Sequence, residues 1–285
     1  MHTIAFLGCG TMGTAILSGI LDACHQQERG ASQESAPLPS QFIATVASEA
    51  SQQKLTRHFE QMGYAGQVEV MVGDNLGAVR RADATMICVK PYLIEQVLGQ
   101  DGMRNALDGK LVASIAAGVT IAQIKHLAPS ANVVRAMPNT ACKIREGMTA
   151  IAGPEGPSDR ALLTAMFSAV GKCTFVDEKH LDVCTAMAGS GPAFTMVFID
   201  AMVDGGVMMG LPRAQALEIA AQTVQGAARL VQETGQPPAV LKDNVTTPGG
   251  CTIAGLLRME DGGVRGTVAR TIQAATERAA ELGKK

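Results

Sequence analysis

Residues 8–13 read Gly8-Cys9-Gly10-Thr11-Met12-Gly13, which is a G-x-G-x-x-G pattern. The apolar run Thr3-Ile4-Ala5-Phe6-Leu7 precedes it, and residues 12–23 follow it with apolar side chains at helical spacing. A buried strand, a glycine turn and a helix in this order are typical of a dinucleotide-binding unit. The first glycine permits a tight turn, the second lets a pyrophosphate approach the backbone, and the third allows the helix to pack closely on the strand. The N–H groups and the dipole of the helix N-terminus then favour an anion.

Strand-like runs and helical patterns alternate through the first half of the chain. The runs are 42–47, 68–72, 84–89, 111–115, 132–136 and 147–151, and the helical patterns are 49–62, 75–82, 92–107 and 120–127. Such alternation predicts right-handed crossovers and a parallel sheet. After Gly153, helical patterns dominate at 158–169, 178–187, 192–209, 213–234, 249–259 and 263–282, with one short strand-like run at 173–176.

We therefore predict an α/β Rossmann domain with a parallel sheet over residues 1–153 and an all-α domain over residues 154–285. The helix predicted at 192–209 is apolar nearly all round, so it must be surrounded within its own domain or by a second subunit. Residues 25–41 are polar and hold Gly and two Pro, which predicts a surface loop inserted between helix and strand.

Composition excludes several classes of protein. The 285 residues carry 24 basic and 26 acidic side chains, for a net charge of −2, with no Trp and 2 Tyr, which argues against a nucleic-acid surface. Seven cysteines without a C-x-x-C pair, and five histidines without an H-x-x-x-H pair, predict reduced thiols and no metal site. The first strand begins almost at Met1, and Asp200 and Asp204 interrupt the most apolar stretch, so we expect a cytoplasmic protein without a membrane span.

The end of the second strand bears on the type of nicotinamide cofactor. The chain there runs Ala47-Ser48-Glu49-Ala50-Ser51. If Ser48 ends the strand, the small uncharged pocket suits the 2′-phosphate of NADP, whereas Glu49 in that place would grip the 2′-hydroxyl of NAD. Lys54 and Arg57 can face the phosphate or simply form a solvated helix face. The sequence favours NADP.

Two glycine-rich segments stand out in the helical half. Ala188-Gly189-Ser190-Gly191-Pro192-Ala193-Phe194 predicts a turn with Pro192 in the first turn of the next helix, and it lacks the G-x-S-x-G of a serine hydrolase. In Leu241 to Thr252, Thr247 can cap a helix that has Pro248 at its first position. The N–H groups of Gly249, Gly250, Cys251 and Thr252 would then be free for a small anion such as a carboxylate.

Taken together, these residues resemble the pyrroline-5-carboxylate reductase family over nearly the whole chain. The motifs that carry the resemblance are residues 8–13, Val89-Lys90-Pro91, Ser114-Ile115-Ala116-Ala117-Gly118, Arg135-Ala136-Met137-Pro138-Asn139-Thr140, Gly189 to Ala193, Asp204-Gly205-Gly206, Gly210-Leu211-Pro212 and Lys242 to Thr252. The resemblance implies an N-terminal Rossmann domain and a helical domain that forms a homodimer, with further assembly to a decamer. It also implies NAD(P)H-dependent reduction of L-1-pyrroline-5-carboxylate to L-proline, the last step of proline biosynthesis, with NADPH preferred and NADH an alternative.

The resemblance also implies roles for individual residues. Those expected at the cofactor are Leu7, Gly8, Cys9, Gly10, Thr11, Met12, Gly13, Ser48, Asn75, Val89, Lys90, Pro91, Ala116, Ala117, Gly118 and Asn244. Those expected at the substrate are Glu178, Val245, Thr246, Thr247, Gly250, Cys251 and Thr252. Cys251 stands where the family usually has Ala, and we expect function to survive because the thiol adds volume but no charge.

A cyclic imine needs a hydride on C5 and a proton on nitrogen. We expect the N-terminus of the predicted helix 249–259 to bind the substrate carboxylate and the Thr252 hydroxyl to contact the imine nitrogen, as a hydrogen-bond partner or a proton relay. Because a threonine pKa is too high for a simple general acid, water can be the proton source. A substrate that binds already protonated would need Thr252 only for orientation.

Two alternatives stay open at this point. A β-hydroxyacid dehydrogenase has a similar architecture, but Lys172 and Lys179 do not lie in the helical pattern that carries its catalytic lysine. A non-catalytic NADP sensor or scaffold is the other, although such a protein would not need to retain the segment Thr246-Thr247-Pro248-Gly249-Gly250.

Overall fold

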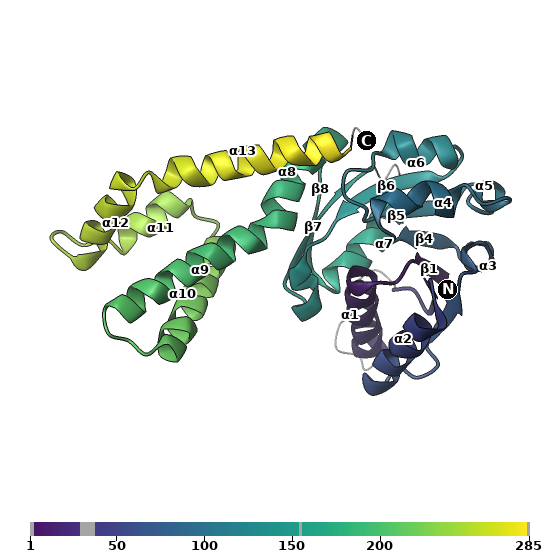
Figure 1. Cartoon of the computed structure of the whole chain (residues 1–285), viewed down its shortest axis with the longest axis horizontal. Helices are drawn as coiled ribbons and strands as arrows, with labels where there is room; N and C mark the ends of the chain where they lie inside the picture. The colour runs from purple at the N-terminus through teal and green to yellow at the C-terminus, as the bar shows by residue number, and fades with distance from the viewer. Residues whose placement is uncertain (1–2, 29–37, 154–155, 284–285) are drawn as a thin grey trace. The chain divides into compact units, whose positions relative to one another are not determined.

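The computed structural model describes residues 3–28, 38–153 and 156–283 (Figure 1). It divides into two compact units, the first made of Met1–Gly189 and Ala275–Lys285 and the second of Ser190–Ala274. This division falls later than the predicted boundary at residue 153, because residues 157–175 form a helix and a strand that belong to the first unit. Of the predicted loop 25–41, residues up to Glu28 continue the first helix, Gln41 begins a strand, and residues 29–37 lie outside the described part.

The first unit contains an eight-stranded sheet in the order β3-β2-β1-β4-β5-β6-β7-β8. The strands are β1 Thr3–Leu7, β2 Gln41–Val46, β3 Val68–Val72, β4 Ala84–Ile87, β5 Leu111–Ser114, β6 Asn132–Met137, β7 Gly147–Ala152 and β8 Gly171–Phe175. Strands β1 to β6 pair in parallel, which confirms the predicted Rossmann architecture. Strand β7 runs antiparallel to β6, unlike the all-parallel expectation, and β8 then pairs with β7 in parallel.

Helices cover both faces of this sheet (Figure 1). They are α1 Thr11–Glu28, α2 Glu49–Gln61, α3 Asn75–Arg81, the 3₁₀ turn η1 Pro91–Leu93, α4 Ile94–Leu98, α5 Met103–Ala106, α6 Ile121–Leu127, the 3₁₀ turn η2 Thr140–Ile144 and α7 Pro157–Ser168. The helix predicted over 92–107 is therefore divided into η1, α4 and α5. Gly102, between the last two, adopts a left-handed φ of +82°.

Strand β1 shows why an apolar run without polar alternation becomes a central strand. Ile4 and Phe6 enter a core with Leu17 of α1 and Phe167 of α7, whereas Ala5 and Leu7 enter a second core on the other face. The second core includes Val79 of α3, Val97 of α4 and Ile124 of α6. A strand that is buried on both faces has no place for an exposed polar residue.

The second unit is helical. It contains α9 Gly191–Met208, α10 Arg213–Thr234, α11 Pro238–Asn244, α12 Cys251–Asp261 and the start of α13 Val264–Leu282, whose last turns belong to the first unit. Helices α9 and α10 pack through Val203, Ala216 and Ala220. A Cβ added to Gly206 would lie 3.1 Å from the Ala216 Cβ, so the glycine allows the two helices to approach closely. The sequence pattern did not predict α11.

The glycine-rich segment at 188–194 is not the turn that its sequence predicts. Residues Glu178–His180 form the 3₁₀ turn η3, Leu181–Cys184 form α8, and Thr185–Ser190 form a π-helical stretch that leads directly into α9. Pro192 lies in the first turn of α9, as expected, because its missing N–H has no partner to lose there. The chain is thus helical without a break from Leu181 to Met208.

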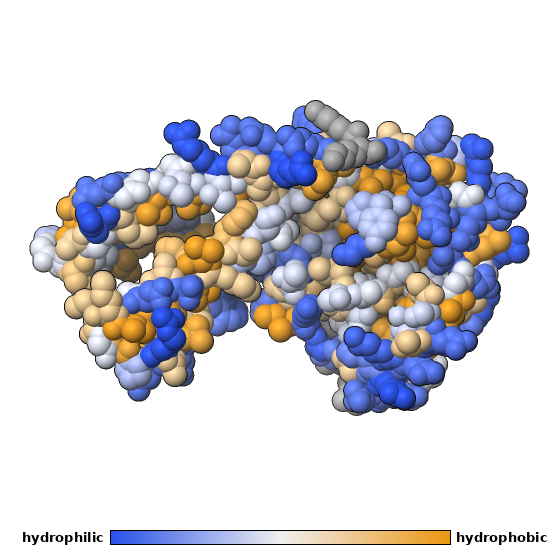
Figure 2. Space-filling model, in the orientation of Figure 1, coloured by the Kyte–Doolittle hydropathy of each residue, from blue (hydrophilic) through white to orange (hydrophobic). Residues whose placement is uncertain are grey.

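Much of α9 is apolar and exposed in the single chain. Met196, Val197 and Met208 are 65%, 71% and 80% exposed, and Figure 2 shows apolar residues at the surface of the helical unit. By length and composition the stretch Glu178–Met208 could cross a membrane, a test that one helix of a soluble protein also passes. The prediction that this helix needs a surrounding surface agrees with its exposure.

Candidate active site

The glycine turn between β1 and α1 can be formed only by glycine at its first position. Gly8 has a φ of +74°, and a Cβ there would lie 2.3 Å from Cγ1 of Val89. A Cβ at Gly13 would lie 3.2 Å from the Cys88 side chain, so α1 packs directly on the end of β4. At Gly10 the nearest atom to such a Cβ is the Gly8 carbonyl oxygen at 3.9 Å, which leaves that part of the backbone open. These contacts match the three structural roles predicted for the glycines.

Thr45 of β2 fastens this turn, a role that its sequence context does not indicate. Its backbone oxygen accepts a hydrogen bond from the Cys9 N–H at 2.8 Å, and its Oγ1 accepts one from the Gly8 N–H at 3.1 Å. The same hydroxyl donates to Oδ1 of Asn75 at 2.6 Å. Thr45 is 1% exposed, and a buried hydroxyl in an apolar strand was the only signal of this role. Asn75, predicted at the cofactor, is thereby tied to the glycine turn.

Cys9 lies within the turn but is not a reactive thiol. Its side chain is buried and contacts Thr14, with 3.8 Å between Sγ and Oγ1. Burial raises the pKa of Cys9 to about 12, because the thiolate would lose its hydration. Cys9 therefore stays a neutral packing residue, and its backbone N–H is already bonded to the Thr45 carbonyl.

The two candidates for adenosine recognition lie at the start of α2. Ser48 is the N-cap residue, and its Oγ accepts a hydrogen bond from the Ser51 N–H, while Glu49 is the first residue of the helix. A cavity of about 700 Å³ begins at Gly10 and Thr11 and extends between α1 and α2. Lys54 lines this cavity, and Arg57 is not one of the described residues that line it.

The strand order reverses between β1 and β4, and the loop after β5 lies on the β4 side of this reversal. Its first residues are held by Oγ of Ser114, which accepts the Ala116 N–H at 3.3 Å. Gly118 has a φ of +80°, and a Cβ there would lie 3.2 Å from the backbone nitrogen of Gly283. Val89, Lys90 and Pro91 follow β4, with Lys90 in extended conformation before η1. In a doubly wound sheet the two halves of a dinucleotide lie on either side of such a reversal.

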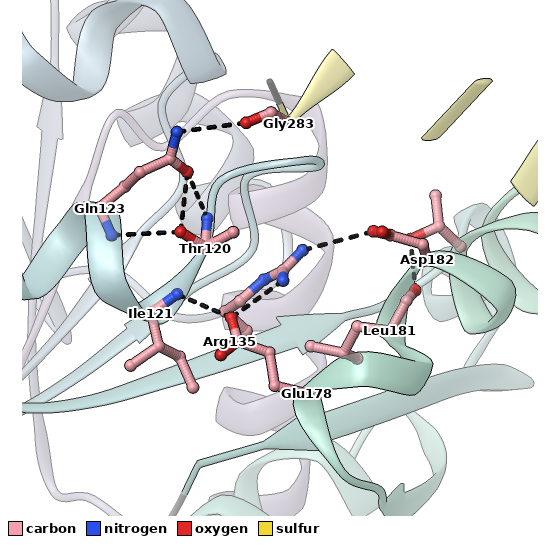
Figure 3. Close-up of polar contacts among 9 residues, drawn as sticks. Thr120, Ile121, Gln123, Arg135, Glu178, Leu181, Asp182 and Gly283 are labelled. Carbon is pink, nitrogen blue, oxygen red and sulfur yellow. Dashed lines mark hydrogen bonds and ion pairs between the residues drawn. The ribbon is translucent and has the colours of Figure 1, made fainter. Parts of the chain in front are cut away.

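Glu178 belongs to a polar cluster in the first unit, in which its own side chain is partly exposed and that of Arg135 is buried (Figure 3). One carboxylate oxygen accepts the Ile121 N–H at 2.8 Å and the Arg135 Nη1 at 3.0 Å. The Arg135 side chain is only 6% exposed, and its Nη2 lies 3.9 Å from Oδ1 of Asp182. The carboxylate predicted to face the substrate is thus already engaged with β6 and the start of α6. The substrate role of Glu178 remains a prediction.

The other predicted substrate residues lie in the second unit, around the turn from α11 to α12. Asn244 ends α11, the Thr246 N–H donates to the Asp243 carbonyl, and the Gly250 N–H donates to the Thr247 carbonyl. Helix α12 begins at Cys251 with Gly250 as N-cap, so the prediction of a Thr247 cap and Pro248 at the first position is wrong. Gly249 has a φ of +69°, a left-handed conformation that no helix can continue through.

The N-terminus of α12 nevertheless offers what a small anion needs, namely N–H groups without an acceptor and the positive end of the helix dipole. Its N-cap is a glycine without a side-chain hydrogen bond, and Cys251 and Thr252 occupy its first turn. Backbone N–H groups at such a position lack an intrahelical acceptor, and the helix dipole adds positive potential. The helix start therefore lies three residues later than the sequence predicted. Of the N–H groups predicted to be free, those of Cys251 and Thr252 lie in its first turn, whereas the Gly250 N–H is bonded to the Thr247 carbonyl.

Comparisons with known proteins agree with these features. Residues 178–282 match the family described as pyrroline-5-carboxylate reductase dimerisation, and residues 3–118 match NADP oxidoreductase coenzyme F420-dependent. A pyrroline-5-carboxylate reductase of Lophium arboricola is 46% identical, with 99% of this chain and 93% of the relative covered.

Two solved structures extend the likeness to the whole fold. A pyrroline-5-carboxylate reductase from Coxiella burnetii has a TM-score of 0.85 at 29% identity and covers 100% of this chain and 99% of its own. Pyrroline carboxylate reductase of Plasmodium falciparum with NADP bound has a TM-score of 0.80 at 27% identity, covering 99% and 98%. By its full-length similarity, this chain belongs to the pyrroline-5-carboxylate reductase family.

Proposed function

We propose that the chain reduces L-1-pyrroline-5-carboxylate to L-proline, with NADPH as the preferred hydride donor and NADH as an alternative. The observation that carries the proposal is the start of α12, where an N-terminus without a side-chain cap presents Thr252 in its first turn. The family membership adds the substrate class, since the relatives are named for this substrate. The same family membership argues against the alternative of a β-hydroxyacid dehydrogenase.

The residues at the glycine turn fit a nicotinamide dinucleotide. The backbone at Gly10 is open where a side chain would block a pyrophosphate, and the turn leads into the N-terminus of α1. Thr45 accepts hydrogen bonds from the Gly8 and Cys9 N–H groups and so fixes the turn, which leaves the N–H groups of the first turn of α1 for the anion. NADPH, when bound, supplies the hydride.

The preference for NADPH is supported by the start of α2. Ser48 is small and uncharged, and Lys54 lines the cavity that begins at Gly10. A 2′-phosphate placed beside Ser48 would find a hydroxyl in place of a carboxylate that grips a free 2′-hydroxyl, and Lys54 adds a positive charge to the cavity between α1 and α2. Glu49 is the competing residue, and the ratio of activities with the two cofactors decides between them.

For the substrate, the N–H groups of the first turn of α12 would bind the carboxylate. The Thr252 hydroxyl would hydrogen-bond the imine nitrogen and so orient C5 toward the incoming hydride. The product requires one hydride on C5 and one proton on nitrogen, and water or the protonated imine itself provides the proton, because a threonine hydroxyl is too weak an acid. Val245, Thr246, Thr247, Gly250 and Cys251 would form the wall of this pocket.

The dimerisation family that matches residues 178–282 indicates a homo-oligomer. An apolar α9 that is exposed in one chain fits burial against a second copy better than insertion in a membrane, because Asp200 and Asp204 interrupt it. We propose a homodimer that assembles further to a decamer in the cytoplasm. Sedimentation equilibrium of the purified chain would measure the number of subunits, and a monomer at micromolar concentration would contradict the dimer.

The decisive experiment measures oxidation of NADPH with L-1-pyrroline-5-carboxylate, with NADH in a parallel assay. We expect rapid turnover with NADPH, a lower kcat/KM with NADH, and proline as the product. A higher kcat/KM with NADH would assign the specificity to Glu49. If NADPH binds but no cyclic imine is reduced, the reaction is refuted and the sensor alternative returns.

A further inference from the structure

The ion pair between Arg135 and Glu178 connects three segments of the first unit that are far apart in the sequence (Figure 3). Arg135 lies in β6, Glu178 begins η3, and the carboxylate reaches the backbone of Ile121 at the start of α6. One oxygen of Glu178 accepts both hydrogen bonds. A change at this one atom therefore affects the guanidinium and the start of the helix together.

The buried Arg135 guanidinium depends on Glu178 as its close counter-ion. Arg135 is only 5% exposed, and its Nη2 has no hydrogen-bond partner in the described structure, since Asp182 is 3.9 Å away. A buried charge that loses its close counter-ion must either move toward water or seek another acceptor. Either movement would disturb β6 and the chain next to it, because Arg135 pairs in register with Ser114 at the end of β5.

Ser114 and Ile121 are the two ends of one loop. Ser114 accepts the Ala116 N–H at the beginning of the loop, and Glu178 accepts the Ile121 N–H at its end. Thr120 and Gln123 form a capping box at the same end. On the far side, the Gln123 amide donates to the Gly283 carbonyl at 3.3 Å, and Gly118 is in close contact with Gly283. The loop 115–120 is thus fixed at both ends and covered by a distant segment.

The position of this loop relates it to one half of the cofactor. Residues 8–13 and the end of β2 take the pyrophosphate and the adenosine, so the ends of β4 and β5 remain for the nicotinamide half. We propose that Arg135 and Glu178 are positioning residues, which hold loop 115–120 in the shape that binds the nicotinamide half. The inference rests on the proposed function for the identity of the cofactor, and it assigns Glu178 a role other than substrate contact.

The test compares two ligands on the full chain. NADPH requires the loop, whereas 2′-phospho-ADP lacks both the nicotinamide and its ribose and requires only the glycine turn and the start of α2. Calorimetry would measure the Kd of each ligand for the wild type, Glu178→Ala and Glu178→Gln. Asp177→Asn is the matched control, because Asp177 is the neighbouring carboxylate, is 72% exposed and pairs only with Lys179 among the described residues.

In Glu178→Ala, which removes both hydrogen bonds to the carboxylate, we expect the Kd of NADPH to rise about tenfold and the Kd of 2′-phospho-ADP to stay unchanged. Glu178→Gln keeps an oxygen for the Ile121 N–H but loses the charge, so its Kd for NADPH should rise by about threefold. If Glu178→Ala does not fold, the test rests on Glu178→Gln, in which the Kd of NADPH should rise and the Kd of the second ligand should not.

Two results would overturn the inference: equal weakening of both ligands, which means a general structural defect, or no change in the Kd of NADPH in either variant. The outcome is separable from the proposed function. A wild type that binds NADPH but reduces no imine refutes the reaction alone, whereas a wild type that binds neither ligand refutes the cofactor and this inference with it.

Discussion

Two glycine-rich segments lead into helices in this chain, and the protein holds them in opposite ways. At the start of α1, Gly8 and Gly13 are enclosed by Val89 and Cys88, and Thr45 fastens the turn by hydrogen bonds. At the start of α12, a Cβ added to Gly249 would meet no described atom within 4 Å, and one added to Gly250 would meet only its own turn at Thr247. The first segment is complete within its unit, whereas the second leaves a surface for a ligand or another chain.

The comparison teaches that the same residue type serves two physical needs. In the first segment glycine is required by both backbone conformation and space, so the anion site is rigid before any ligand arrives. In the second segment Gly249 is required only by conformation, because it has a φ of +69° in open surroundings, whereas a Cβ at Gly250 would lie 2.5 Å from Oγ1 of Thr247. The cysteines of the two segments show the same difference in enclosure, because Cys9 is buried and Cys251 is exposed.

The largest contrast should appear in the reaction of these two cysteines with an alkylating reagent. Because the pKa of Cys9 is raised to about 12, its thiolate fraction at pH 8 is roughly a thousandfold below that of an ordinary thiol. We expect iodoacetamide to label Cys251 and to leave Cys9 unlabelled, as measured by peptide mass spectrometry over time. Turnover should fall with labelling of Cys251 while the Kd of NADPH stays constant. Equal labelling of Cys9 would show that the first turn is open.

Gly8→Ala should weaken NADPH binding by about a hundredfold, because the new Cβ meets Val89 and the turn must shift its N–H groups. The matched control is Gly66→Ala, since Gly66 has the same φ of +74° but no described atom within 4 Å of an added Cβ. Fluorescence titration of NADPH would measure both. A similar Kd in the two variants would mean that conformation alone, and not the contact with Val89, makes Gly8 necessary.

Thr252→Ala should lower kcat by about 10–100-fold through the loss of one oriented hydrogen bond, with the Kd of NADPH unchanged. Thr267→Ala is a suitable control, because that hydroxyl donates only to the Gly263 carbonyl at the start of α13 among the described residues. Steady-state kinetics with L-1-pyrroline-5-carboxylate would compare them. A Thr252→Ala enzyme with wild-type kcat would remove this hydroxyl from the mechanism.

Gly249→Ala should have the smallest effect. Its left-handed φ costs about 1–2 kcal/mol for a residue with a Cβ, but no atom of the described residues lies where the methyl group would go. We expect a lower free energy of unfolding by that amount, measured in urea, with little change in NADPH binding. If Gly249→Ala weakened NADPH binding as much as Gly8→Ala, the start of α12 would be enclosed in the assembled protein.

Much of the fold could be predicted from local pattern. The helix predicted at 213–234 is α10 with the same bounds, since its apolar spacing is regular and Pro212 and Gly235 limit it. Helix α11 was not predicted, because it begins at the second of two adjacent prolines and has only seven residues. The direction of β7 could not be predicted either, since a short apolar strand has the same pattern whichever way it runs.

The site divides in the same way. The glycine turn was predictable because its conformational requirements are local. The start of α12 was misplaced because Thr247 and Pro248 are favourable at a helix start, and the left-handed Gly249 overrides that preference. The contacts of Thr45 with Asn75, and of Arg135 with Glu178, join residues 30 and 43 positions apart, so no local pattern indicates them.

The second unit, Ser190–Ala274, is inserted between two parts of the first, and this order has a consequence for synthesis. The ribosome completes the sheet, the glycine turn and the Arg135–Glu178 pair before it makes the helical unit. The contacts of Gly283 with Gly118 and Gln123 can form only after that unit has been translated. A nascent chain stopped near residue 260 would therefore carry a folded sheet whose loop 115–120 still lacks its cover, and a chaperone or protease would meet the loop in that state.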